Sequence, residues 1–232
     1  MLGLSRERFA LLIKTLSICV LAAAANLLFI AHIGASPLVL VLFQDTVFTA
    51  AVAFALGPIP GIAAAALTWA AYGVWLGFHP FLPVAVAEVL LICRLKPAPP
   101  AERIVFRTRD PILRERSMVS LVSVLASLAL LYLACAFSAS VLGGAIESLR
   151  GIAGGAQNPD EFLYYTAIRI GLLQTGVSAL PASIVSRLLV NMADRFFVVF
   201  GGYLISLGIK WAMNFGKKGT SAPRETTGAR AG

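Results

Sequence analysis

The chain has 232 residues, of which 59% are hydrophobic and only 13% are charged. Soluble domains carry about 25% charged residues, so the composition excludes an ordinary soluble protein. The net charge of +8 does not indicate nucleic-acid binding, because 15 of the 19 Lys and Arg residues lie in three segments, residues 6–14, 94–116 and 210–230. The positive-inside rule produces this distribution, so we expect these three segments to be cytoplasmic.

Long uncharged runs predict an all-α integral membrane protein with a bundle of six transmembrane helices. Residues 15–44, 46–87 and 117–146 contain no Asp, Glu, Lys or Arg, and about 20 apolar residues cross a bilayer as a helix. Gly and Pro clusters separate the runs. We expect one membrane domain over residues 1–215 and a disordered, basic cytoplasmic tail over residues 216–232. The expected helices cover about residues 9–33, 37–56, 62–76, 81–95, 118–146 and 188–210.

The apolar segment 162–182 is expected to be an external or re-entrant helix. It contains Arg169 and Gln174 and is predicted to stop at Pro181. If it crossed the membrane, the basic tail would lie outside, against the positive-inside rule. We therefore expect a multi-pass protein of the cytoplasmic (inner) membrane, with both termini in the cytoplasm.

Three carboxylates, Asp45, Glu88 and Asp194, interrupt the apolar segments. A carboxylate at bilayer depth costs roughly 2.5–3.5 kcal/mol unless it is paired, protonated or facing a wet cavity. At a rise of 1.5 Å per residue, Asp45 and Glu88 are expected about 12 Å from the outer ends of their helices, and Asp194 about 9 Å. These acids are therefore predicted to share one layer in the outer half of the membrane, as part of a ligand pocket.

Further polar and aromatic residues are expected in the same layer. Asn26 is predicted about 10 Å, and Trp69 and Tyr72 within about 12 Å, of the outer ends of their helices. Acids, amides and aromatic rings suit a small polar or cationic ligand, although Arg169, Arg187 and Arg195 could equally accept a carboxylate. Each residue also has a structural interpretation. Asp194 or Asp45 could pair with Arg195, Glu88 could be protonated or pair with Arg94 or Arg169, Asn26 could link helices, and the aromatic rings could simply pack.

Two motifs carry a resemblance to a known family. They read FQDTVFTAAVAFALGPIPG at residues 43–61 and NMADRFFVVFGGY at residues 191–203. The chain resembles the S components, the substrate-binding membrane subunits of energy-coupling factor (ECF) vitamin transporters. Similar membrane modules precede bacterial sensor kinases. The resemblance implies a six-helix subunit that captures a small molecule at its outer side, with a transmembrane coupling subunit and cytoplasmic ATPases as partners. The candidate ligand-binding residues are Asn26, Gln44, Asp45, Trp69, Tyr72, Glu88, Asn191, Asp194 and Arg195.

Other functions remain open at this point. A membrane-embedded sensory module could use the same pocket, and a proton-coupled secondary transporter could use the acids as a relay. The sequence shows no nucleophile–base pair and no metal-ligand spacing, so we expect no enzyme, catalytic residue, metal or cofactor. Neighbouring ATPase genes would favour transport, and a neighbouring kinase gene would favour sensing. Loss of uptake when the proton gradient is dissipated would favour the secondary transporter.

Overall fold

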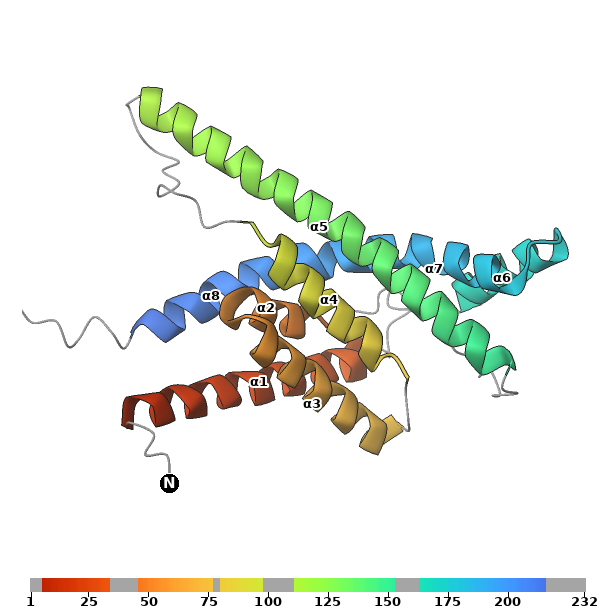
Figure 1. Cartoon of the computed structure of the whole chain (residues 1–232), viewed down its shortest axis with the longest axis horizontal. Coiled ribbons are helices and arrows are strands. Elements are labelled where there is room, and N and C mark those ends of the chain that lie inside the picture. The colour runs from red at the N-terminus through yellow and green to blue at the C-terminus, as the bar shows by residue number, and fades with distance from the viewer. Residues whose placement is uncertain (1–5, 34–45, 77–79, 98–110, 153–162, 216–232) are drawn as a thin grey trace, which may run out of the picture.

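The computed structural model describes residues 6–33, 46–76, 80–97, 111–152 and 163–215. Within these ranges every regular element is a helix (Figure 1), which confirms the all-α prediction. The predicted tail, residues 216–232, lies outside the described residues. The elements are α1 (Arg6–Ile33), α2 (Val47–Leu56), α3 (Pro58–Leu76), α4 (Leu82–Leu95), α5 (Pro111–Ile152), α6 (Leu163–Gln174), α7 (Ala179–Phe196), the π-helix η3 (Phe197–Gly201) and α8 (Gly202–Phe215).

The short helix α2 lies at the centre of the fold, in contact with α1, α3, α4, η3 and α8. Its residues Ala50–Phe54 are all buried. The three alanines in this run allow neighbouring helices to approach closely. Gly57, with φ +98°, turns the chain from α2 directly into α3, a backbone conformation that favours glycine.

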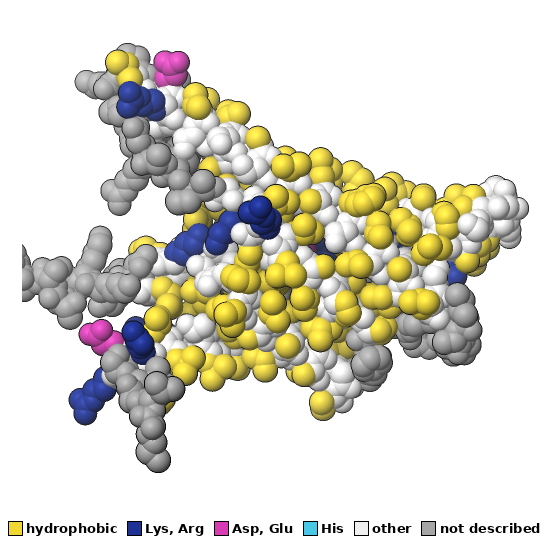
Figure 2. All heavy atoms as spheres, in the orientation of Figure 1, with side chains coloured by type: hydrophobic (Ala, Val, Ile, Leu, Met, Phe, Trp, Pro, Cys, Tyr) yellow, Lys and Arg dark blue, Asp and Glu magenta, His cyan; other side chains and the backbone are white. Residues whose placement is uncertain are grey.

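Among the described residues, three helices are long and apolar enough to cross a membrane. They are α1, α5 and the continuous helix formed by α7, η3 and α8. Their exposed side chains include many of Leu, Val, Phe and Ile. Hydrophobic side chains cover much of the face of the molecule in Figure 2. These features indicate a membrane protein. The start of α1, the end of α4, the start of α5 and the end of α8 lie toward one end of the molecule (Figure 1). Most of the Lys and Arg side chains visible in Figure 2 gather at this end.

The six-crossing arrangement stays a prediction. As described, α2 has 10 residues and α4 has 14. At 1.5 Å per residue these correspond to about 15 Å and 21 Å, less than the roughly 30 Å hydrocarbon core. The predicted beginning of the second helix, residues 37–45, lies outside the described residues. Helix α5 is longer than its predicted range of 118–146, because it starts at Pro111 and ends at Ile152.

The boundary between the last two predicted helices was wrong. Helix α6 ends before Gly176, whose φ is +87°. The Gly176 N–H donates to the Leu173 carbonyl at 3.1 Å, and the Val177 N–H donates to the Leu172 carbonyl at 3.0 Å. This is the Schellman pattern that glycine makes possible at a helix end. The chain then starts α7 at Ala179 instead of residue 188.

Pro181, predicted to end the preceding segment, instead lies in the first turn of α7. An N–H in the first turn of a helix has no intrahelical partner, so proline loses nothing there. Glycine was therefore the true helix end, and proline belonged to the helix start.

Helices α5 and α7 cross closely at Gly144. A Cβ atom added to Gly144 would lie 2.8 Å from Ile184 Cγ1 and 3.0 Å from Ile184 Cα. Backbone cannot move aside cheaply, so the substitution Gly144→Ala is expected to lower the free energy of unfolding by about 1–3 kcal/mol. Thermal unfolding in detergent measures this change.

Gly208 on α8 is the matched control, because a Cβ atom there would meet nothing within 4 Å. Gly208→Ala should be neutral or stabilising by up to about 1 kcal/mol, since alanine favours the helix. An equal loss of stability in both variants would show that the α5–α7 crossing is not the constraint.

Candidate functional site: a buried ionic cluster at the start of α2

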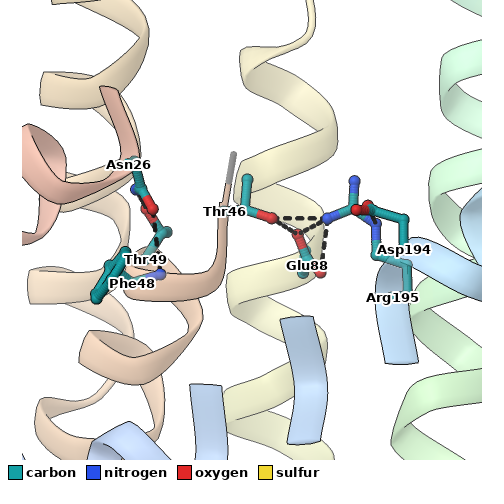
Figure 3. Close-up of polar contacts among 7 residues, drawn as sticks. All are labelled: Asn26, Thr46, Phe48, Thr49, Glu88, Asp194 and Arg195. Atoms are coloured by element: carbon teal, nitrogen blue, oxygen red, sulfur yellow. Dashed lines mark hydrogen bonds and ion pairs between the residues drawn. The ribbon is translucent and has the colours of Figure 1, made fainter. Parts of the chain in front are cut away.

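A buried ion pair joins α4 to α7. Arg195 Nη1 donates to Glu88 Oε2 at 2.9 Å and to Oε1 at 3.1 Å. The side chains of Arg195 and Glu88 are only 7% and 5% exposed. Thr46, the residue before α2, completes the group: its hydroxyl accepts from Arg195 Nη1 at 2.7 Å and donates to Glu88 Oε2 at 3.1 Å (Figure 3). Three segments of the chain are thus held together by one guanidinium.

Asp194 brings a second carboxyl to the same guanidinium. It is fully buried, and its Oδ2 lies 3.5 Å from Arg195 Nε. The alternative pairing of Asp194 with Arg195 is therefore seen in the structure. Glu88 also pairs with Arg195, and not with Arg94 or Arg169, the two partners considered from the sequence. We call Thr46, Glu88, Asp194 and Arg195 the ionic cluster.

The two acids meet, although their distances from the starts of their helices differ from those expected from the sequence. Glu88 lies six residues after the start of α4 and Asp194 lies 15 residues after the start of α7. At 1.5 Å per residue these separations are about 9 Å and 22 Å. Since Glu88 and Asp194 flank the same arginine, the first turns of α7 extend beyond the start of α4. The expected distance of about 9 Å between Asp194 and the start of its helix was too short, because the helix begins at Ala179 and not at residue 188.

Asn26 forms a second polar group, centred on α1. Its amide nitrogen donates to Thr49 Oγ1 at 2.9 Å, and its Oδ1 accepts from the Phe48 N–H at 3.1 Å (Figure 3). The same amide nitrogen also donates to Thr68 Oγ1 at 3.1 Å. The Phe48 N–H belongs to the first turn of α2, where no intrahelical acceptor exists. Asn26 therefore caps α2 from another helix, which matches the interpretation that it links helices.

The remaining candidates lie apart from the ionic cluster or outside the described residues. Asn191, one turn before Arg195 on α7, donates to Ser140 Oγ on α5 at 3.0 Å. The Trp69 and Tyr72 rings contact each other on α3, with centroids 5.5 Å apart. Gln44 and Asp45 fall outside the residues that the structure describes. They immediately precede Thr46 in the sequence.

The start of α2 is the point where both polar groups attach. Thr46 belongs to the ionic cluster, while Phe48 and Thr49 are held by Asn26. Sequence reasoning missed the threonines, because single hydroxyls in apolar helices are common and carry little signal. The one cue in the sequence was that Thr46 directly follows Asp45 in the motif at residues 43–61.

A second charged group lies where α5, α6 and α7 meet. Glu147 Oε2 accepts from Arg187 Nε at 2.8 Å, and Glu147 Oε1 lies 3.4 Å from Arg169 Nη1. The Arg187 guanidinium also lies over the Phe81 ring, 4.9 Å from its centroid. Sequence reasoning placed both arginines near the outer side but missed Glu147, which directly follows the predicted helix 118–146.

The chemistry available to the ionic cluster is recognition of charge and of hydrogen-bond donors. Two carboxyls and one guanidinium can receive a cation, a proton or a donor-rich group. No group of three His, Cys, Asp or Glu suitable for a metal ion occurs among the described residues. Comparisons of the chain with protein-family models, with curated proteins and with solved structures find no match.

Proposed function

We propose that this chain is the substrate-capturing membrane subunit of an ECF-type, ATP-driven uptake transporter for a vitamin or similar small molecule. The ligand binds beside the ionic cluster, in the outer half of the cytoplasmic (inner) membrane, with both termini in the cytoplasm. A transmembrane coupling subunit and cytoplasmic ATPases complete the transporter. The observation that carries this proposal is the assembly of Glu88, Asp194 and Arg195 within apolar helices.

The cost of burying these groups supports a functional role. Ionisable side chains within membrane helices are expensive, and they commonly mark substrate or ion pathways. A purely structural link between α4 and α7 requires only one acid and one arginine. The additional carboxyl of Asp194 is fully buried at the same guanidinium.

The cluster favours a ligand that is cationic or rich in hydrogen-bond donors. The described cluster contains two acidic groups and one basic group. A donor from the ligand would interact favourably with these carboxyls in this low-dielectric setting. Asp45 precedes Thr46 in the sequence and is proposed as a further ligand-binding residue, together with Gln44.

Asp194→Asn is expected to weaken ligand binding by about 10- to 100-fold, because a hydrogen bond to a charged group contributes roughly 1.5–3 kcal/mol. The asparagine keeps the shape of the side chain, so expression should be unchanged. Native mass spectrometry of the purified protein would first identify the small molecule that co-purifies. Calorimetric titration of the wild type and the variant with that molecule would then measure the loss.

Glu7→Gln is the matched control for Asp194→Asn, because Glu7 is an exposed acid in the first turn of α1. It should bind the ligand as the wild type does. Equal affinity of Asp194→Asn and wild type would remove the ionic cluster from the binding site. Uptake that persists without a proton gradient, while ATP is maintained, would separate ATP-driven from proton-coupled transport.

A further inference from the structure

In the charged group at the junction of α5, α6 and α7, one arginine pairs closely with Glu147 and the other does not. Glu147 is close to Arg187, at 2.8 Å, and more distant from Arg169, at 3.4 Å. The second contact is longer than the usual 2.7–2.9 Å of a charge-assisted hydrogen bond. Yet the Arg169 side chain is only 13% exposed. Helix α6 thus carries a largely buried cation that is weakly paired with its acid.

Each of the three helices that meet here carries one buried donor without a hydrogen-bond partner in the part of the chain that the structure describes: Ser148 Oγ on α5, Arg169 Nε on α6 and Ser183 Oγ on α7. Ser183 is completely buried and lies one turn before Arg187 on the same side of α7. Ser148 directly follows Glu147. Buried donors without partners are rare in proteins and often indicate an ion, water or ligand that completes them.

A group that satisfies these donors has to be a hydrogen-bond acceptor, because a guanidinium N–H can only donate. Both hydroxyls can donate to the same kind of group. An anion would satisfy these donors and also compensate the weakly paired charge of Arg169. A cation would be repelled by the two arginines.

The junction lies at the edge of the bundle. Arg187 lies over Phe81, the residue directly before α4, so the charged group is level with the start of α4. Helices α6 and α7 meet at the end of the molecule opposite the end of α8 (Figure 1). Both α6 and α7 carry large exposed apolar side chains, as expected of a surface that contacts lipid. They are Ile170, Leu173, Leu180, Val185 and Leu189.

We propose that this junction binds an anionic group, a carboxylate or a phosphate, through Arg169, Ser148 and Ser183. The anion belongs to a lipid headgroup or to a small solute, and both present the same acceptor oxygens. This site is separate from the ionic cluster, and it does not depend on the proposed transport function. Glu147 and Arg187 position Arg169 and do not have to release their own contact.

Binding to the purified full-length protein in detergent tests this site. Native mass spectrometry would compare bound phosphatidylglycerol with bound phosphatidylcholine, and thermal-shift titration would use inorganic phosphate and acetate. Arg169→Gln and Ser183→Ala should each weaken binding of the anion by about tenfold, as expected for one lost charged hydrogen bond. Preferential phosphatidylglycerol binding identifies a lipid, and a thermal shift with phosphate or acetate identifies a solute; either result supports the site.

Two comparisons separate anion binding from a structural role. Ser183→Ala removes a buried hydroxyl without a partner, so the anion-free variant should melt at the wild-type temperature or above it. Arg94→Gln, on an exposed arginine in the last turn of α4, should bind the anion as the wild type does. The proposal is overturned if neither probe binds more strongly to wild type than to Arg169→Gln. It is also overturned if Ser183→Ala lowers the melting temperature without affecting binding.

Discussion

Arg195→Met is expected to lower the free energy of unfolding by about 3–5 kcal/mol, because removing one partner leaves a buried charge without compensation. Glu88 would lose both of its contacts with the guanidinium, at 2.9 Å and 3.1 Å. Thr46 would also lose its shortest contact, at 2.7 Å. Thermal or denaturant unfolding of the detergent-solubilised protein would measure the loss.

The double variant Glu88→Gln with Arg195→Met separates the pair from the individual side chains. Neutral glutamine keeps a polar partner for the Thr46 hydroxyl and leaves no carboxylate at position 88. We expect the double variant to be more stable than Arg195→Met alone, since replacement of both members of a buried ion pair is often tolerated. Additive losses in the double-mutant cycle would contradict the direct coupling of Glu88 and Arg195.

Asn26→Ala is expected to lower the free energy of unfolding by about 2–4 kcal/mol, because it removes a helix cap and leaves buried polar groups without partners. The Phe48 N–H loses its acceptor, and the Thr49 and Thr68 hydroxyls lose their donor. The same change should loosen the start of α2. Hydrogen exchange of the first α2 amides would therefore accelerate together with the loss in melting temperature.

Asn191→Ala provides the comparison for Asn26→Ala. Asn191 is also nearly buried, but its side chain donates one hydrogen bond, to Ser140. A single hydrogen bond contributes about 1 kcal/mol, so this variant should lose less stability. Equal losses in Asn26→Ala and Asn191→Ala would show that capping of α2 by Asn26 contributes little.

The contacts between polar side chains were predicted from the sequence more accurately than the starts of the helices were. Glu88 and Asp194 were expected to share a layer because of their positions along the predicted helices, and the structure places both at Arg195. The start of α7 could not be placed, because Gly176 and Pro181 are both helix-breaking residues. Only the left-handed backbone at Gly176 shows which of them ends α6.

Other parts of the site depended on contacts between distant segments. The hydrogen bond from the Phe48 N–H to Asn26 joins α2 to α1. Every residue except proline has a backbone N–H, so the residue type at position 48 could not predict this bond. Glu147 was not a candidate, because it directly follows the predicted helix 118–146. The geometry of helix packing, and not local propensity, brings it to Arg187.

The π-helix η3 separates two parts of one long helix that have different packing partners. In an uninterrupted α-helix, Arg195 and Gly202 would point in nearly the same direction, because seven residues make almost two full turns. The π-turn adds a residue to the turn between them and shifts the phase of everything that follows. Arg195 reaches Glu88 on α4 and Thr46 directly before α2. Gly202 lies against α2, where a Cβ atom added to it would be 2.9 Å from Ala50 Cβ. The continuous helix therefore packs against α5 before η3 and against α2 after it, and the change follows directly after the buried charges of Asp194 and Arg195.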